Sequence, residues 1–296
     1  MAKETIAVLL ALGAALFIAI SDVIHQRAAQ EVTDEPVGHV ELFIRLLADR
    51  LWWMGSLVAA VGFTLQAAAL GFGSVLLVES LLVTSLLFAL PISAGQAGRS
   101  MGRSVWLWAA LLASAVTVII VVGHPTAGQS RASLQTWIAV VAVLGPVLVL
   151  CLLGARAWPG RVAAVLLAVV SAASWAMFAV LTKGVVDLIG RGPAALLVSP
   201  ELYAWAVVGL AGTVSQQSSF RAGALTASLP TMTVLEPVIA GALGVALLGE
   251  VLRPGRAGGL ALALAVVALV VAVAVLSREE MAADQIRDPA AVSPRR

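Results

Sequence analysis

Charged residues are scarce in this sequence. Of its 296 residues, 11% are charged and 61% are hydrophobic, and the mean hydropathy is +1.03. Soluble domains carry about 25% charged residues, so this composition excludes an ordinary soluble protein and indicates an all-α integral membrane protein. The net charge is only +2, and the basic residues lie between apolar segments, so we expect no nucleic-acid partner.

Cysteine is almost absent, and the motifs of common enzymes are missing. The single cysteine, Cys151, lies inside an apolar segment, so no disulfide framework or thiolate metal site can form within one chain. The sequence has no His-Glu-x-x-His, no Walker-type Gly-Lys-Ser/Thr loop, no Gly-x-Ser-x-Gly and no Cys/His cluster. We therefore expect no enzyme, no ATP hydrolysis and no cofactor.

Nine apolar segments are long enough to cross a bilayer, which requires about 20 residues. They cover residues 5–24, 51–70, 75–94, 104–122, 134–153, 162–181, 202–219, 226–248 and 257–276. In the longest loop, Val40, Phe43 and Leu46 recur at helical spacing and predict a short helix on the membrane surface. The polar residues 278–296 have no periodic apolar face, and we expect a disordered cytoplasmic tail.

The distribution of lysine and arginine predicts the orientation. Alternating spans place most of these 18 residues on one side and leave six on the other: Lys3, Arg131, Lys183, Arg191, Arg253 and Arg256. The richer side is expected to be cytoplasmic. This predicts a multi-pass protein of the cytoplasmic (inner) membrane, with its N-terminus outside and its C-terminus inside.

A weak internal repeat relates the two halves of the chain. Each half has a Trp-led span with Gly-x-x-x-Gln, at Gly62 with Gln66 and at Gly212 with Gln216, followed by a span that contains a glutamate. The pattern predicts a first repeat at 1–125, a linking fifth helix at 126–158 and a second repeat at 159–277. Because the fifth helix is unpaired, the second repeat is inverted, and inverted repeats place a substrate site at their interface near the midplane.

The segment from residue 225 to residue 250 is apolar but contains Pro230 and Pro237. Each proline lacks an N–H and displaces a carbonyl four residues earlier, at Thr226 and Thr233. Lipid cannot satisfy those carbonyls, so we expect a broken helix that lines a polar pathway.

Two glutamates lie inside predicted spans, Glu236 and Glu79. A charged carboxylate at mid-bilayer costs about 2.5 to 3.5 kcal/mol, so such groups tend to face a pathway and act as proton or cation sites. The alternative for each is a protonated acid that links two helices by hydrogen bonds.

The other candidate residues have two interpretations each. Thr233, Gln66 and Gln216 either line the site or join helices, whereas Ser174 and Trp175 are candidates for a cavity wall that stacks on organic cations. Asp22 and His25 either reach the membrane interface or, if the first helix extends past Arg27, form part of a gate. Lys183 forms either a local ion pair with Asp187, four residues away, or one side of a cavity mouth.

The run ALLGEVLRPGRAGGLALALAVVALVVAV resembles the C-terminal signature of the drug/metabolite transporter superfamily. A proline-containing helix ends in Leu-Gly-Glu, with Gly249 and Glu250, and a basic turn at Arg253 precedes a glycine-rich helix. The EamA branch usually has ten helices; nine helices with this glycine pattern look more like the NIPA-type branch, which is described as magnesium transporters. Glu250 is expected to make a structural contact with a helix terminus.

These features favour a secondary transporter that moves a small metabolite or drug-like organic solute by alternating access, with H⁺ or another cation as the coupling ion. The first alternative is a magnesium transporter that uses two carboxylates and the carbonyls freed by the prolines. The others are a flippase for a lipid-linked sugar and a non-transporting membrane assembly subunit. The expected partners are the substrate and the bilayer, with a homodimer as a candidate assembly.

Overall fold

The structure is a computed structural model that describes residues 2–32, 50–96, 102–222 and 225–287. These residues form α1 (Ala2–Val32), α3 (Arg50–Phe72), α4 (Val75–Leu82), α5 (Ser85–Gln96), α6 (Arg103–Gly123), α7 (Leu134–Ala157), α8 (Arg161–Gly190), α9 (Pro193–Val198), α10 (Pro200–Arg221), α11 (Leu225–Leu248) and α12 (Gly255–Arg287). Within them there is no strand, only an isolated bridge between Thr126 and Val251. The all-α prediction is confirmed.

Eight helical segments among the described residues are long and apolar enough to cross a membrane. They correspond to eight of the nine predicted spans, because about 20 apolar residues in lipid must satisfy their backbone groups within a helix. The ninth, predicted at 202–219, is the 22-residue α10, which contains a polar run from Thr213 to Ser219. The protein is therefore a multi-pass membrane protein.

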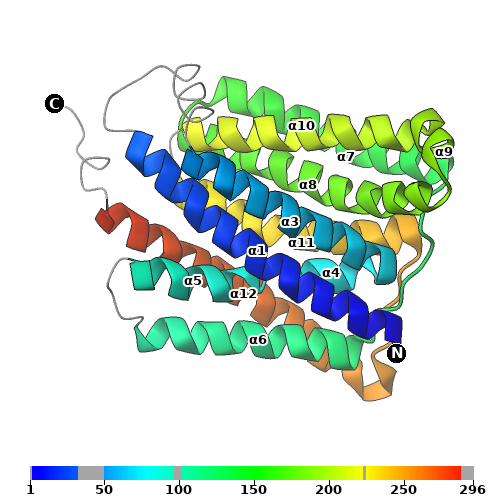
Figure 1. Ribbon diagram of the computed structural model, residues 1–296, viewed down its shortest axis with the longest axis horizontal. Helices are drawn as coiled ribbons and strands as arrows, with labels where there is room; N and C mark the ends of the chain where they lie inside the picture. Colours follow the sequence, from blue (N-terminus) through cyan, green and yellow to red (C-terminus); the bar gives the residue numbers. More distant parts are fainter. Residues whose placement is uncertain (1, 33–49, 97–101, 223–224, 288–296) are drawn as a thin grey trace.

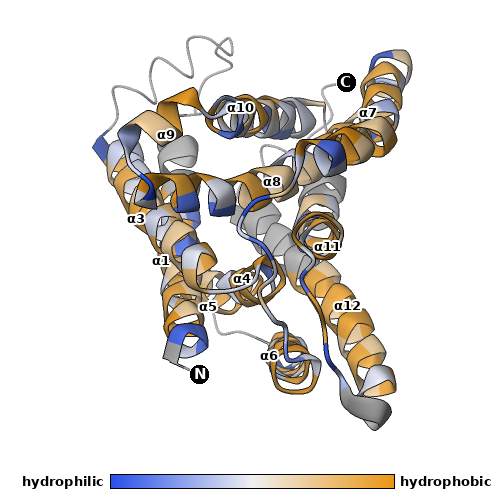
Figure 2. Cartoon of the chain, turned by 90° about the vertical axis from the view of Figure 1, so that its right-hand side faces the viewer, coloured by the Kyte–Doolittle hydropathy of each residue, from blue (hydrophilic) through white to orange (hydrophobic). Residues whose placement is uncertain are grey.

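The long helices lie side by side and run back and forth between two ends of the bundle (Figure 1). The first residues of α1 and the last residues of α12 lie at opposite ends. Viewed from the end where α1 begins, the connection between α6 and α7 is mostly hydrophilic, whereas α6, α7 and α12 are mostly hydrophobic (Figure 2). That end is called the α1-start end below.

The interior of the bundle is built around α4 and α8. Six of the eight residues of α4 are buried, and 72% of the α8 span is buried, against 6% of the α7 span. α4 contacts α1, α11, α6 and α8, whereas α7 packs against α8 at the edge. Side chains on α4 and α8 are therefore shielded from lipid, and α7 exposes its apolar surface to it.

The interrupted helix is in the first half of the chain. α4 and α5 are separated at Val83 and Thr84, where Thr84 N bonds Leu81 O at 2.9 Å and the Thr84 hydroxyl donates to the same oxygen at 2.6 Å. The predicted span at 75–94 is confirmed as a candidate span at Val75–Ile92, but the prediction did not include this interruption of its helix. A threonine hydroxyl competing for the helix carbonyl accounts for the local turn.

The predicted break in the proline-containing segment is wrong, because α11 is one helix from Leu225 to Leu248. Pro230 and Pro237 lie inside it. Each proline removes one backbone hydrogen bond, and neighbouring helices and threonine side chains can satisfy the freed carbonyls in a membrane helix.

Two helices are longer than predicted. α1 continues past Arg27 to Val32, which is the condition under which Asp22 and His25 were candidates for a gate. α12 continues to Arg287, so the prediction of disorder is wrong for 278–287, where Glu, Met, Ala and Gln favour a helix. Residues 288–296 and the predicted surface helix at 40–47 lie outside the described residues.

Candidate functional site

The first turn of α4 is the best-defined polar site in the described residues. Ser74 precedes the helix in an extended conformation, and its hydroxyl accepts a hydrogen bond from Leu77 N at 3.0 Å. The Glu250 carboxylate accepts from Val75 N at 2.6 Å and from Leu76 N at 3.0 Å. The first three N–H groups, which have no partner within a helix, are all satisfied.

Glu250 also faces a buried cation. Lys183 Nζ lies 2.9 Å from Glu250 Oε1, and their side chains are 6% and 1% exposed respectively. The carboxylate thus joins α4, α8 and the connection between α11 and α12. We call this arrangement, formed by Glu250, Lys183 and the N–H groups of Val75 and Leu76, the Glu250 clamp. It confirms the expected contact of Glu250 with a helix terminus, and the helix is α4.

Glycines allow the chain to reach this position. Gly249 ends α11 with φ +64°, a conformation that favours glycine. A Cβ on Gly244 would lie 2.6 Å from Glu250 Oε2, and a Cβ on Gly128 would overlap Leu248 O. Side chains at either position would therefore push the carboxylate or the adjoining loop away.

The pairing of Lys183 corrects the local ion pair expected with Asp187. Asp187 instead faces Arg191, with 2.7 Å between Oδ2 and Nη2. Lys183 turns inward because a carboxylate in the protein interior compensates the cost of burying its ammonium. A second long-range ion pair, Arg131 with Glu201 at 2.8 Å, lies at the same end and is more exposed.

Sequence reasoning missed the clamp because the partners of Glu250 lie 67 or more residues away from it in the chain. One signal was present: the predicted topology placed Lys183 and the basic turn after Glu250 on the same side of the membrane. A lysine and a glutamate near the ends of apolar spans on one side are candidates for pairing.

The two glutamates inside candidate membrane spans, Glu79 and Glu236, called the mid-membrane glutamates below after their predicted position, have fewer partners. Glu79 on α4 is 4% exposed, and its Oε1 accepts from Gln66 Nε2 at 3.2 Å. Glu236 on α11 is half-buried and lies within electrostatic range of Glu79 and of Asp22. Neither glutamate has an ion-pair partner among the described residues. The structure thus brings Glu79, Gln66 and Glu236 into one region.

Trp175, Ser174 and Gln216 lie where α8 packs on α10. Trp175 Nε1 donates to Gln216 Oε1 at 3.3 Å, and Ser174 Oγ donates to Val170 O of its own helix at 2.8 Å. Trp175 also meets Phe178 edge to face with 5.2 Å between centroids, and Phe178 stacks on Trp205. These contacts are those of helix packing.

Four other candidates are less defined. Thr233 is half-buried on α11, three residues before Glu236. Asp22 is exposed near the end of the first span. The side chains of His25 and Pro230 lie outside the described residues.

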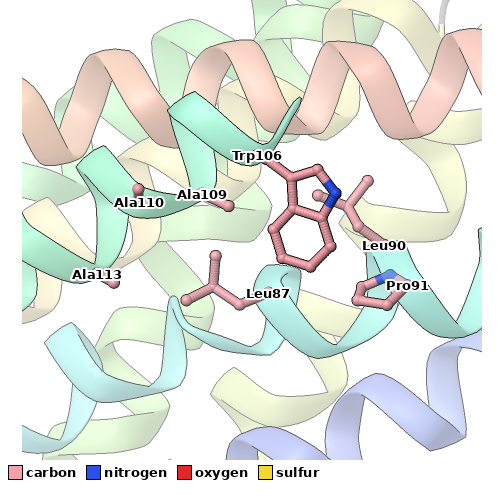
Figure 3. Close-up of a pocket in the computed structure, with 7 residues that line it drawn as sticks. All are labelled: Leu87, Leu90, Pro91, Trp106, Ala109, Ala110 and Ala113. Atoms are coloured by element: carbon pink, nitrogen blue, oxygen red, sulfur yellow. The ribbon is translucent and has the colours of Figure 1, made fainter. Parts of the chain in front are cut away.

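Two of the cavities that the described residues form open on the bundle surface. One of about 300 Å³ lies between α5 and α6, where the Trp106 ring faces Leu87, Leu90 and Pro91 (Figure 3). Its lining is apolar and holds none of the predicted site residues. The other, of about 340 Å³, lies at the α1-start end and is lined by Lys3, Glu4, Phe72, Gly73, Ser74, Leu77, Pro125 and Ala127. We call it the vestibule.

No group of three or more His, Cys, Asp or Glu side chains is placed to hold a metal ion within the described residues. Among the described residues the buried carboxyl groups are Glu250, which is paired with a buried lysine, and Glu79, whereas Glu236 is half-buried.

The fold and these sites define a multi-pass α-helical membrane protein with ionisable side chains inside its bundle. The chain is 36% identical over 283 residues to an uncharacterized protein of Corynebacterium glutamicum, and the alignment covers 94% of this chain and 96% of that protein. The chain belongs to the same protein family as this relative. No protein-family model and no solved structure matches the chain.

Proposed function

We propose that the protein is a proton- or cation-coupled secondary transporter of the drug/metabolite type, which moves a small organic solute across the cytoplasmic membrane. The observation that carries the proposal is Glu79, a carboxyl group 4% exposed within a membrane span and bonded to the amide of Gln66. An ionisable group at that depth is retained against a substantial insertion cost, and a pathway for protons or cations is its usual role.

Packing supports two related halves and a nine-helix arrangement in which α10 is the seventh crossing. α1 packs against α3 and against α4 and α5, and α8 packs in the same way against α10 and α11. Both glycines of the repeated motif lie at these contacts: a Cβ on Gly62 would lie within 3.3 Å of Phe17 and Ile18 of α1, and a Cβ on Gly212 would lie within 3.4 Å of Ser174 and Trp175 of α8. The linking helix α7 stays at the edge.

The mid-membrane glutamates occupy corresponding helices of the two halves, α4 and α11. In the proposed cycle, the protonated acids release their protons as a cationic solute enters, and the solute leaves when protons return. Movement of one half against the other exposes the site to each side in turn. A drug-like cation or metabolite is the expected cargo.

Charge placement supports the orientation proposed. Arg50, Arg103 and Arg161 begin α3, α6 and α8, and these three helix starts lie at the end of the bundle opposite the N-terminus (Figure 1). Cytoplasmic ends of membrane helices are enriched in lysine and arginine. The α1-start end therefore faces outward in our proposal.

A flux panel in proteoliposomes tests the function. Purified protein is supplied with organic cations, neutral metabolites or Mg²⁺, with and without a pH gradient. We expect gradient-dependent flux of an organic solute that falls at least about tenfold in Glu79→Gln and Glu236→Gln, because a neutral amide cannot exchange a proton. Glu201→Gln is the matched control, since this glutamate pairs with Arg131 outside the site, and its flux should stay within about twofold of wild type.

The same panel separates the alternatives. Mg²⁺ flux without any organic solute would replace the cargo with a divalent cation, and scrambling of a labelled lipid-linked sugar would replace it with a lipid. Flux that is identical in wild type, Glu79→Gln and Glu236→Gln would refute the coupling role of the glutamates. Absence of flux in every arm would favour an assembly subunit.

A further inference from the structure

The Glu250 clamp joins the two halves of the chain. Val75 and Leu76 belong to the first half, whereas Lys183 and Glu250 belong to the second. The side chain of Glu250 therefore crosses the interface at which the halves must move relative to each other during transport. Lys183 comes from α8, the most buried of the spans.

The backbone that carries Glu250 is held separately from its side chain. Thr126 N bonds Val251 O at 3.0 Å, Arg253 N bonds Gly123 O at 2.7 Å, and Gln129 N bonds Leu248 O at 2.7 Å. These bonds fix the connection between α11 and α12 against the end of α6. Loss of the side-chain contacts would therefore free α4 without unfolding the connection.

The vestibule reaches the residue next to the clamp. It runs from the exposed Lys3 and Glu4 to Ser74 and Leu77, and Ser74 is the residue before Val75, whose N–H bonds Glu250. Leu77 is only 3% exposed. The vestibule thus ends beside the first turn of α4, and Glu79 lies one turn further along the same helix.

A buried ion pair suits a contact that must open. Both ions regain hydration when water reaches them, whereas an apolar contact of the same size would lose the hydrophobic contribution on opening. The pair also has a defined closed geometry, because two N–H groups and one ammonium converge on a single carboxylate.

We infer that the Glu250 clamp is the gate that closes the pathway at the α1-start end, and that the structure has this gate shut. The inference rests on the proposed transport function. The sequence pattern presents Glu250 as part of a family signature, and the inference gives this residue a part in the transport cycle. When the gate opens, the Lys183 ammonium separates from the Glu250 carboxylate.

The test measures access of water-soluble thiol reagents to the floor of the vestibule. In full-length protein with Cys151→Ser in nanodiscs, Leu77→Cys supplies the reporter, and its labelling rate by a charged thiol reagent is compared across gate variants. We expect Lys183→Met and Glu250→Gln to raise the rate about tenfold or more, because removing one partner of a buried pair favours the hydrated, open arrangement. Lys183→Arg keeps the charge and should stay near the parent rate.

Two controls separate gating from general loosening. Arg131→Met breaks the other long-range ion pair at this end and should leave labelling at position 77 unchanged. A second reporter, Ala164→Cys, replaces a residue that is 0% exposed near the opposite end of α8. In a gate variant, only the reporter at position 77 should respond.

Equal increases at positions 77 and 164 would overturn the gate, since the variants would then merely loosen the fold. An unchanged rate at position 77 in both Lys183→Met and Glu250→Gln would also overturn it, and would leave the transport proposal standing if flux persists. A selective rise at position 77 supports the gate. If no solute is transported by the wild type, that rise still shows an opening, and the transport function alone is refuted.

Discussion

Glu250 and Glu79 are both buried glutamates, 2% and 4% exposed, but their surroundings differ. Glu250 receives two backbone N–H groups and the Lys183 ammonium, whereas Glu79 receives the amide of Gln66. Glu236 has neither an ion pair nor a hydrogen bond to another described residue.

The comparison teaches that burial alone does not define the role of an ionisable residue. A carboxylate with its charge compensated and its oxygens bonded is stable as an ion, and its removal leaves other groups unsatisfied. A carboxyl group with one neutral partner is free to exchange a proton at little cost to its neighbours. The number and charge of the partners therefore separate the Glu250 clamp from the mid-membrane glutamates.

The largest effect is expected for Glu250→Ala. The substitution leaves the Lys183 ammonium and two N–H groups of α4 without their acceptor inside the protein. Removing one member of a buried ion pair typically costs about 3 to 5 kcal/mol. Equilibrium unfolding in mixed micelles, followed by tryptophan fluorescence, measures the loss.

Glu201→Ala is the control for that measurement. In its ion pair with Arg131, the Glu201 side chain is 13% exposed and the Arg131 side chain is 32% exposed. We therefore expect Glu201→Ala to lower the free energy of unfolding by about 0.2 to 1 kcal/mol. Equal losses for the two variants would mean that the clamp is no more important to stability than a surface pair.

Gly244→Ala tests how closely the clamp is packed. The added Cβ would lie 2.6 Å from Glu250 Oε2 and 3.5 Å from Val75 Cβ. Overpacking of this kind costs about 1 to 3 kcal/mol, which the same unfolding measurement detects. Gly145→Ala is the matched control: on the exposed α7 its nearest neighbour is Val141 at 3.8 Å, and alanine should stabilise that helix by about 0.5 to 1 kcal/mol. A stabilising Gly244→Ala would contradict the close contact.

Much of the fold could be predicted from the sequence because lipid imposes a strong constraint. Apolar runs such as Arg50–Phe72 and Leu134–Ala157 can satisfy their backbone only as helices, so their ends were found within a few residues. The break at Val83 and Thr84 was missed because no proline or glycine marks it. The prolines of α11 were overweighted, since a membrane helix can continue through a proline.

The candidate site was predictable only where a single residue type is informative. Glu79 and Glu236 stand out because a carboxyl group is rare in an apolar span, and the structure brings them into one region with Gln66. The partner of Lys183 was not predictable from local spacing, which favoured Asp187. The true partner depends on how α8, α4 and the connection after α11 meet in space.

Gln66→Leu measures the single hydrogen bond that Glu79 has in the described residues. The variant removes the amide donor 3.2 Å from Glu79 Oε1. Polar contacts between membrane helices average about 0.6 kcal/mol and reach about 1.7 kcal/mol. The free energy of unfolding of Gln66→Leu should therefore fall by about 0.6 to 1.7 kcal/mol. A loss comparable to that of Glu250→Ala would show that Glu79, like Glu250, holds helices together.

The smallest effect is expected when glutamate is replaced by glutamine at positions 79 and 236. The new amide in Glu79→Gln keeps an acceptor for Gln66 and disturbs no ion pair among the described residues, so stability should change by less than about 0.6 kcal/mol. Glu250→Gln removes the charge opposite Lys183 and should cost several-fold more, in the range of about 3 to 5 kcal/mol. The free energies of unfolding of Glu79→Gln, Glu236→Gln and Glu250→Gln, measured in parallel, test this difference. If Glu79→Gln unfolds as readily as Glu250→Gln, then Glu79 is a structural link, and a loss of flux in that variant reports damage to the fold instead of a role in coupling.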